Sequence, residues 1–184
     1  MKISKIILFI GVFLILLIIS FVLLKKQTDE PETNYDVTII DFESCVLAGN
    51  PIMESYPRQC QAIDGRNFVE NIGNELEKTD LIQISSPRPN DLIISPLTIS
   101  GVARGNWYFE ASFPVVLLDG NNSIIVQHYA QAQGEWMTEN FVPFESELTF
   151  TKPNTATGYL ILKKDNPSGL PEYEDELIVP VRFE

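Results

Sequence analysis

Residues 108–118 read YFEASFPVVLL, and this stretch decides the fold because apolar residues occupy alternate positions along it. A period of two places alternate side chains on one face of a β-strand, whereas a helix repeats every 3.6 residues. One face of this strand is expected to consist of Phe109, Ala111, Phe113, Val115 and Leu117. The stretch therefore predicts an extended strand with one buried face.

Similar stretches, rich in β-branched and aromatic residues, surround this one. The seven expected strands cover residues 81–85, 97–102, 108–118, 123–131, 142–151, 158–164 and 176–183. Turn-forming residues separate them at 87–91, 119–122, 153–154 and 166–169. The pattern predicts a mainly β fold of two antiparallel sheets packed face to face. Pro114 and Pro180 lie inside expected strands, so we expect them at sheet edges or bulges.

Three parts of this region resemble a known domain family. They read IQISSPRPNDLIISPLTISGVARGNWYFEASFPVVLLDGNNSII, EWMTENFVPFESELTF and NPSGLPEYEDELIVPVRF, from residue 82 onward. Over residues 81–184 the chain is similar to the immunoglobulin-like domain associated with bacterial spore-germination proteins. The resemblance implies a seven-stranded antiparallel immunoglobulin-like sandwich, and a role in extracytoplasmic adhesion or protein contacts. It supplies no catalytic residue.

Near the N-terminus, residues 6–24 carry no charge, and lysines flank them on both sides. At about 1.5 Å per residue a helix of this length reaches roughly 29 Å, which is enough to cross the hydrocarbon core of a bilayer. A cleaved signal peptide is the alternative, but the sequence after the segment has no small-residue cleavage site. We therefore expect a single-pass anchor in the cell membrane. The flanking charges favour a cytoplasmic N-terminus and an extracytoplasmic C-terminal part, although with little bias.

The residues beyond this segment are strongly acidic. Four of the 13 Lys and Arg residues flank the charge-free segment, while all 25 Asp and Glu residues lie at position 29 or later. Such a surface repels phosphate backbones, so we expect no nucleic-acid partner. The expected order is a membrane anchor at 1–26, an acidic linker at 27–40, a small disulfide module at 41–72, a second linker at 73–80 and the sandwich at 81–184.

Cys45 and Cys60 are the only two cysteines, and both fall in the small α+β module. In an exported protein such a pair is typical of a disulfide, because thirty residues bury little apolar core. A closed loop of this length stabilises the folded state by about 3 kcal/mol in the chain-entropy model. Metal or redox use remains an alternative, although one histidine and the spacing do not favour it.

The module reads CVLAGNPIMESYPRQCQAIDGRNFVE at residues 45–70 and resembles short two-cysteine modules of uncharacterised exported bacterial proteins. That resemblance implies no activity. Tyr56 and Arg58 are candidate contacts for a ligand or partner, and the alternative is that they brace a tiny fold. Trp107, Tyr108 and Trp136 are further candidates, because aromatic planes near strand ends can stack on sugars or fill a partner's pocket. For these three the alternative is a place in the core.

No arrangement of residues in the sequence indicates catalysis or a metal site. The only histidine, His128, falls in an expected strand without a nucleophile motif nearby. Glu145 and Glu147 share one face of a strand, which suits a solvated surface as well as acid–base chemistry. The loop beginning at Asp119 resembles a calcium loop but lacks its twelfth-position glutamate, so a hairpin turn is expected there. We expect no enzyme, no cofactor and no bound metal.

Together these observations predict a membrane-tethered extracytoplasmic binding or scaffolding protein of the bacterial cell envelope. Its partner is expected to be an envelope protein or a wall polymer. The alternative is a cell-envelope enzyme, or a subunit of one, that uses surface carboxylates. A weaker alternative is an assembly unit whose exposed edge strands pair between chains.

Overall fold

The computed structural model describes residues 38–184 of the 184-residue chain. The chain divides into two units, Met1–Thr38 and Ile39–Glu184, and every described residue except Thr38 belongs to the second. The expected membrane anchor at residues 6–24 lies outside the described residues. Within the part that is described, no helix combines the length and apolar character needed to cross a membrane.

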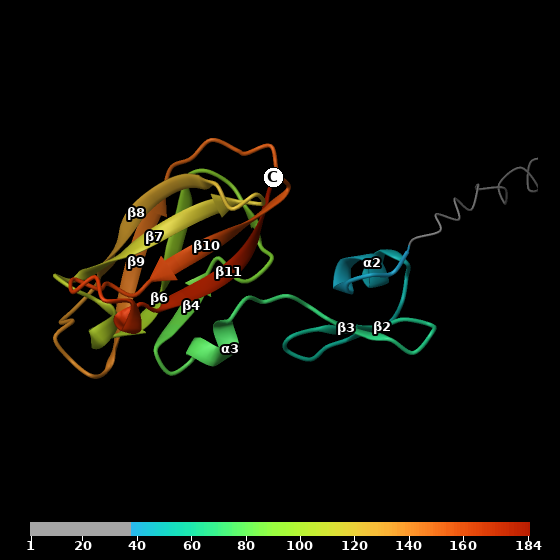
Figure 1. Cartoon of the computed structure of the whole chain (residues 1–184), viewed down its shortest axis with the longest axis horizontal. Coiled ribbons are helices and arrows are strands. Elements are labelled where there is room, and N and C mark those ends of the chain that lie inside the picture. The colour runs from blue at the N-terminus through green and yellow to red at the C-terminus, as the bar shows by residue number, and fades with distance from the viewer. Residues whose placement is uncertain (1–37) are drawn as a thin grey trace, which may run out of the picture. The chain divides into compact units, whose positions relative to one another are not determined.

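Eight strands form the large sheet of the second unit (Figure 1). In chain order they are β4 (Ile82–Ser86), β5 (Leu92–Ile93), β6 (Leu97–Arg104), β7 (Ser112–Asp119), β8 (Ile124–Ala132), β9 (Phe141–Leu148), β10 (Thr157–Lys163) and β11 (Glu176–Phe183). Their order across the sheet is β4-β6-β9-β8-β7-β10-β11-β5. Short 3₁₀ helices lie between strands at Gly105–Trp107 and Pro171–Tyr173.

The structure corrects the predicted sandwich in three ways. The sheet has eight strands rather than seven, because β5 was not predicted. The strands also form one continuous, curled sheet, whose two halves join where β8 and β9 pair at only two positions. The pairing is not wholly antiparallel, since β5 runs parallel to the end of β11. A two-residue strand is too short to show an alternating pattern, and β5 is recognised by its pairing with β11.

A single core fills the inside of the curled sheet, as an immunoglobulin-like sandwich requires. The side chain of Phe113 on β7 meets that of Phe144 on β9 edge-to-face, with ring centroids 5.0 Å apart. The largest fully buried side chains belong to Trp107, Phe113, Phe144, Ile82, Ile99, Leu117, Leu148, Leu160, Leu162, Leu177, Val115 and Val179. Apart from Trp107, which ends the first 3₁₀ helix, they come from strands in both halves, so burial of apolar surface stabilises the curled arrangement.

The predicted strand at residues 108–118 is confirmed only from Ser112 onward. Phe113, Val115 and Leu117 are fully buried, as expected, but Phe109 is 42% exposed. Glu110 and Ala111 both have positive φ, at 48° and 62°, and they turn the chain back so that Phe109 and Ser112 exchange two backbone hydrogen bonds. The alternation of apolar residues continued through this tight turn and made the strand look longer than it is.

Both strand prolines lie where one flank of their strand is unpaired. On β7, pairing with β10 begins at Val115, so Pro114 lies just beyond the paired part of β10. On β11, pairing with β5 involves only Arg182 and Phe183, and β5 does not reach Pro180. Because proline has no N–H to donate, these are positions that a sheet tolerates. The prediction of edge positions for the two prolines is confirmed.

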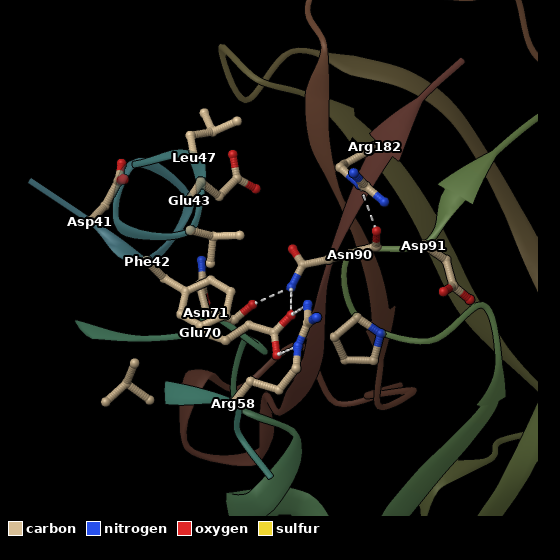
Figure 2. Close-up of a pocket in the computed structure, with 13 residues that line it drawn as sticks. Asp41, Phe42, Glu43, Leu47, Arg58, Glu70, Asn71, Asn90, Asp91 and Arg182 are labelled. Atoms are coloured by element: carbon tan, nitrogen blue, oxygen red, sulfur yellow. Dashed lines mark hydrogen bonds and ion pairs between the residues drawn. The ribbon is translucent and has the colours of Figure 1, made fainter. Parts of the chain in front are cut away.

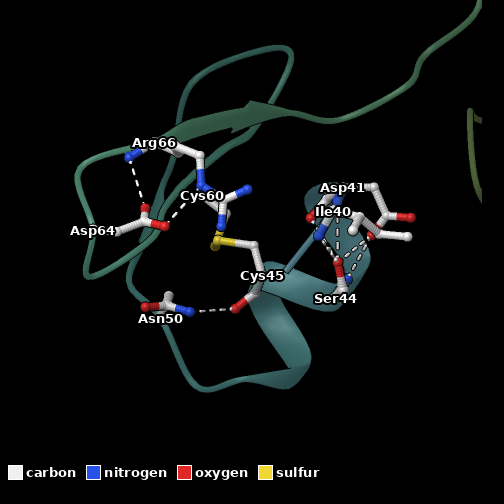
Figure 3. The surroundings of a disulfide bond; sticks show 8 residues. All are labelled: Ile40, Asp41, Ser44, Cys45, Asn50, Cys60, Asp64 and Arg66. Carbon is white, nitrogen blue, oxygen red and sulfur yellow. Dashed lines mark hydrogen bonds and ion pairs between the residues drawn. A yellow bond between two sulfur atoms is a disulfide. The ribbon is translucent and has the colours of Figure 1, made fainter. Parts of the chain in front are cut away.

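The two-cysteine module combines a helix, α2 (Phe42–Leu47), with a three-stranded sheet of β1 (Ile52–Met53), β2 (Gln59–Gln61) and β3 (Asn67–Val69). Asp41 starts the helix, because its carboxylate accepts a hydrogen bond from the Ser44 amide while the Ser44 hydroxyl accepts one from the Asp41 amide. Figure 3 shows the Cys45–Cys60 disulfide, which joins α2 to β2. The expected α+β character and the expected disulfide of the module are therefore confirmed.

A short helix, α3 (Glu75–Lys78), occupies the segment expected to be a second linker. Just before it, the Asn74 side chain accepts a hydrogen bond from the Ile178 amide and donates one to the Glu176 carbonyl of β11. At Gly73, where φ is +71°, a Cβ atom would lie 1.8 Å from the Ile178 carbonyl oxygen. This close approach leaves room only for glycine, and it fixes the chain leaving the module against β11.

Candidate functional site

A groove of about 700 Å³ lies between the module and one end of the large sheet. Figure 2 shows α2 on one side, with Asp41, Glu43 and Leu47, and the loop that carries Asn90 and Asp91 on the other. Its base is formed by the ends of β2 and β3. The groove is therefore built from segments that lie far apart in the sequence.

An ion pair between Arg58 and Glu70 lies at the base of this groove. Arg58 Nε donates to Glu70 Oε2 at 2.9 Å, and Arg58 Nη2 donates to Oε1 at 2.5 Å. Asn90 Nδ2 donates a third hydrogen bond to Oε1 at 3.1 Å and a further one to the Asn71 carbonyl at 2.9 Å. The Glu70 side chain is only 8% exposed, so this carboxylate is nearly withdrawn from water. Both of its oxygens are already engaged by the protein.

The hydrogen bonds from Arg58 hold the pKa of Glu70 below its ordinary value, although partial burial acts in the opposite direction. Glu70 is therefore a permanently charged structural group at neutral pH. A general acid or base needs a proton-transferring oxygen near the substrate and a pKa close to the working pH. Glu70 meets neither condition, and its position at the base of the groove does not by itself indicate catalysis.

The walls of the groove combine acidic and apolar side chains. Asp41 and Glu43 place carboxylates on the α2 side, and Asp91 places another on the loop side. Leu47 and Val69 add apolar surface, being 79% and 54% exposed. Arg182 lies on the loop side, where its Nε donates to the Asn90 carbonyl at 2.7 Å. The walls would suit a ligand with apolar groups and positive charge.

Tyr56 and Arg88 form a second link between the module and the sheet. The Tyr56 hydroxyl donates to Glu75 Oε2 and accepts from Arg88 Nη2 at 2.8 Å. Arg88 Nη1 also lies 2.6 Å from Glu75 Oε1. Burial, together with the hydrogen bond to Glu75, raises the pKa of Tyr56 to about 12. The polar groups of Tyr56 and Arg58 thus brace the fold, and only Arg58 lines the groove.

The structure contradicts the expectation that Trp107 and Tyr108 contact a partner. Trp107 is fully buried, and Tyr108 is 4% exposed, with its hydroxyl donating to the Val142 carbonyl at 2.8 Å. Both belong to the core because the chain turns inward through the 3₁₀ helix at Gly105–Trp107 before β7 begins. Trp136 is half-buried against the same core and lies away from the groove. The five candidates therefore do not converge on one site.

The remaining candidate groups are explained by local structure. Asp119 Oδ1 accepts hydrogen bonds from the amides of Asn121 and Ser123, both at 2.8 Å, as the predicted hairpin turn requires. His128 is exposed on β8. Across residues 38–184, no three side chains of His, Cys, Asp or Glu are grouped so that they would hold a metal ion. None of these groups forms a second site.

Sequence reasoning missed most of the groove. Arg58 was named, but Glu70, Asn90, Arg182 and Leu47 were not. Asn90 lies 20 residues from Glu70, and Arg182 lies 92 residues from Asn90. No motif links such distant residues. The one available signal was Leu47, an apolar residue at the end of a short helix in a module too small to bury it.

One comparison with known proteins gives a match. Residues 81–169 match the family model described as the immunoglobulin-like domain of bacterial spore germination, which is not a known enzymatic family. A search of curated proteins gives no match. The curled sheet and its core agree with the family model, and the disulfide module precedes the matched residues. Residues 81–169 of this chain are thus similar to the immunoglobulin-like domain of bacterial spore germination.

Proposed function

We propose that this chain is a membrane-tethered extracytoplasmic binding protein of the bacterial cell envelope. In this proposal the groove beside α2 holds a segment of a partner protein. The observation that carries the proposal is the groove itself, in which Leu47 remains 79% exposed beside a neutralised Arg58–Glu70 pair. Exposed apolar side chains that line a groove are typical of interaction sites.

The proposed location rests on two other features. The charge-free segment at residues 6–24 is long enough to serve as a membrane anchor. The Cys45–Cys60 disulfide supports an oxidising compartment for the folded part, since the cytosol keeps most thiols reduced. With the lysines on both sides, these features favour a cytoplasmic N-terminus and a folded part outside the membrane.

The chemistry of the groove favours a peptide with basic and apolar side chains. Asp41 and Glu43, at the start of α2, would attract a lysine or arginine, while Leu47 and Val69 would cover an aliphatic side chain. The Arg58–Glu70 pair offers little net charge, because each group neutralises the other. We propose no catalytic role for the groove, since its one shielded carboxylate is held by three hydrogen bonds.

Site-specific photo-crosslinking tests the binding proposal. A photoreactive amino acid at position 47 is expected to give a discrete protein adduct in intact cells. The same amino acid at position 63 is the matched control, because Ile63 is also an exposed apolar residue of the module, at 98%, but lies outside the groove. Equal crosslinking at both positions would overturn the proposal. An adduct that wall-degrading enzymes digest would replace the protein partner with a wall polymer.

Alkaline extraction and thiol labelling test the location. We expect the full chain to remain in the membrane pellet after alkaline washing. Cys45 and Cys60 should react with a thiol reagent only after reduction, and a protease added to cells stripped of their wall should remove the folded part. Recovery of the chain in the washed supernatant, or protection of the folded part from the protease, would contradict the proposal.

A further inference from the structure

One half of the large sheet carries apolar side chains on its outer face as well as toward the core. Along β7, Val115 and Leu117 point into the core, so Val116 and Leu118 point outward. Paired residues of neighbouring strands share a face, which identifies the outward residues of β8 and β10. Figure 1 shows these three strands side by side. We call their outward set the outer apolar face, and it comprises Ile124, Tyr129, Val116, Leu118, Tyr159 and Ile161.

The outer face of the other half of the sheet is polar instead. There, Thr98 of β6 pairs with Glu147 of β9, and Ser100 pairs with Glu145. Antiparallel sheets usually alternate in this way, with apolar residues inside and polar residues in water. Residues 115–118 and 159–162, by contrast, are apolar throughout. Such continuous apolar runs are typical of strands that are covered on both faces.

The outer apolar face is separate from the core. Val116 and Ile161 are each 6% exposed, yet neither belongs to the buried cluster of the sandwich or to that of the module. Toward β8 the face is open to solvent, since Ile124 is 64% exposed and Tyr129 is 46% exposed. Contiguous apolar surface that remains exposed is typical of interaction sites.

The chain itself covers the next strip of this surface. Ile178 of β11 pairs with Ile161, so it continues the outer apolar face by one strand. The segment before α3 lies against this strand, because a Cβ atom at Gly73 would meet the Ile178 carbonyl oxygen. Asn74 fastens the segment to β11 through two hydrogen bonds, and α3 follows in contact with the same strand. A second layer over this half of the sheet therefore begins within the chain, and it begins with a helix.

We propose that the outer apolar face binds one amphipathic α-helix of a partner protein, and that the polar side of this helix carries lysine and arginine. The open part of the face spans β8, β7 and β10, which are two strand spacings of about 4.8 Å and together cover about 10 Å. A single helix with its side chains has a diameter of about 10–12 Å, so the two widths match. Strand addition does not apply at the centre of the face, because β7 and β10 are each paired on both sides.

Charge selects a basic protein partner over the other possible occupants of the face. The chain has a net charge of −12, so it repels a second copy of itself, anionic lipids and anionic wall polymers. The same field attracts a helix whose polar side is basic, while the apolar side of that helix covers the uncharged face. The helix site is independent of the groove beside α2, because none of the six residues of the outer apolar face lines that groove.

Crosslinking from the outer apolar face of the full chain in intact cells tests the proposal. Benzoylphenylalanine at position 129 replaces one exposed aromatic side chain with another and is expected to give a discrete protein adduct. Position 98 is the matched control, because Thr98 is also exposed on the outside of the same sheet but in its polar half. Mass spectrometry of the crosslinked peptide should identify a segment with apolar residues at i, i+3, i+4 and i+7 and with lysine or arginine between them.

A substitution at a second position shows whether the whole face takes part. Ile124→Gln should leave the fold intact, because Ile124 is 64% exposed, and should lower the adduct yield from position 129 about fivefold, because apolar contact with the helix is lost. Thr98→Gln, the matched control, should leave that yield unchanged. Equal yields from positions 129 and 98, or a yield that Ile124→Gln does not lower, would overturn the proposal. An adduct with a second copy of the chain, a lipid, a wall polymer or a segment whose apolar residues alternate would overturn it as well.

Discussion

The sandwich and the two-cysteine module are stabilised by different kinds of interaction. The sandwich buries 21 apolar residues in one continuous core. The module buries only Phe42, Cys45, Cys60 and Ala62 in its own cluster. A fold of about thirty residues has too much surface for its volume, so burial alone does not stabilise it. The comparison indicates that size decides whether apolar packing or covalent and polar links stabilise a region.

The largest expected effect concerns the buried core of the sandwich. Phe113→Ala should lower the free energy of unfolding by about 4 kcal/mol, because it leaves a cavity between Tyr108 and Phe144. Urea unfolding followed by tryptophan fluorescence measures this, since both tryptophans lie in the sandwich. Phe109→Ala, four residues earlier but 42% exposed, is the control and should cost less than about 1 kcal/mol. Equal losses of unfolding free energy in the two variants would show that burial in the core does not dominate the stability of the sandwich.

The next effect concerns the module. Replacing both cysteines, as Cys45→Ser with Cys60→Ser, should destabilise the module by about 3 kcal/mol, because the closed loop of its unfolded state is released. Hydrogen exchange of the α2 and β2 amides measures the loss. The urea midpoint reported by Trp107 and Trp136 should hardly move. If the protection of the α2 and β2 amides and the urea midpoint fell together, the module and the sandwich would unfold as one cooperative unit.

A smaller effect is expected at the base of the groove. Glu70→Gln should cost about 2 kcal/mol at pH 7, because it removes a shielded, charge-assisted pair of hydrogen bonds. The folded-state pKa of Glu70 lies below its ordinary value of 4.5. The stabilisation is therefore complete above that value and is lost as the pH falls through the lowered folded-state pKa.

Thermal unfolding between pH 7 and pH 3 checks this direction of the pH dependence. The difference in Tm between wild type and Glu70→Gln should be constant at neutral pH and should shrink below about pH 4.5. Asp64→Asn is a matched control, because the Arg66–Asp64 pair is about half exposed on both sides. It should change Tm less than Glu70→Gln does. A difference in Tm between wild type and Glu70→Gln that stays the same down to pH 3 would exclude Glu70 ionisation as its cause.

The smallest effect tests local structure within the module. Asp41→Ala removes the N-cap of α2 and should cost about 1 kcal/mol. Circular dichroism of so short a helix is weak, so exchange at the Ser44 amide is the better measurement. Glu43→Ala, in the first turn but without a capping bond, should have a smaller effect. Equal effects of the two changes would attribute the loss to charge at the helix terminus rather than to capping.

Local patterns predicted the elements well wherever local forces determine them. Asp41 and Gly49 lie at the ends of α2, and Asp64-Gly65 lies in the module hairpin, because capping and positive φ are properties of a few neighbouring residues. The start of β7 was misplaced, since alternation alone does not distinguish a strand from the tight turn at Glu110 and Ala111. Strand β5 was missed because a strand of two residues is too short to show an alternating pattern of apolar residues.

The sequence by itself determined the strand-rich domain, its resemblance to a known domain family and the cysteine pairing, because periodicity, motif and composition act over short distances along the chain. Only the tertiary structure decided that Trp107 and Tyr108 belong to the core and that eight strands form one curled sheet. It also decided that Arg58, Glu70, Asn90 and Arg182 meet in a groove. Burial and long-range hydrogen bonds depend on which distant segments become neighbours, and no local pattern encodes that choice.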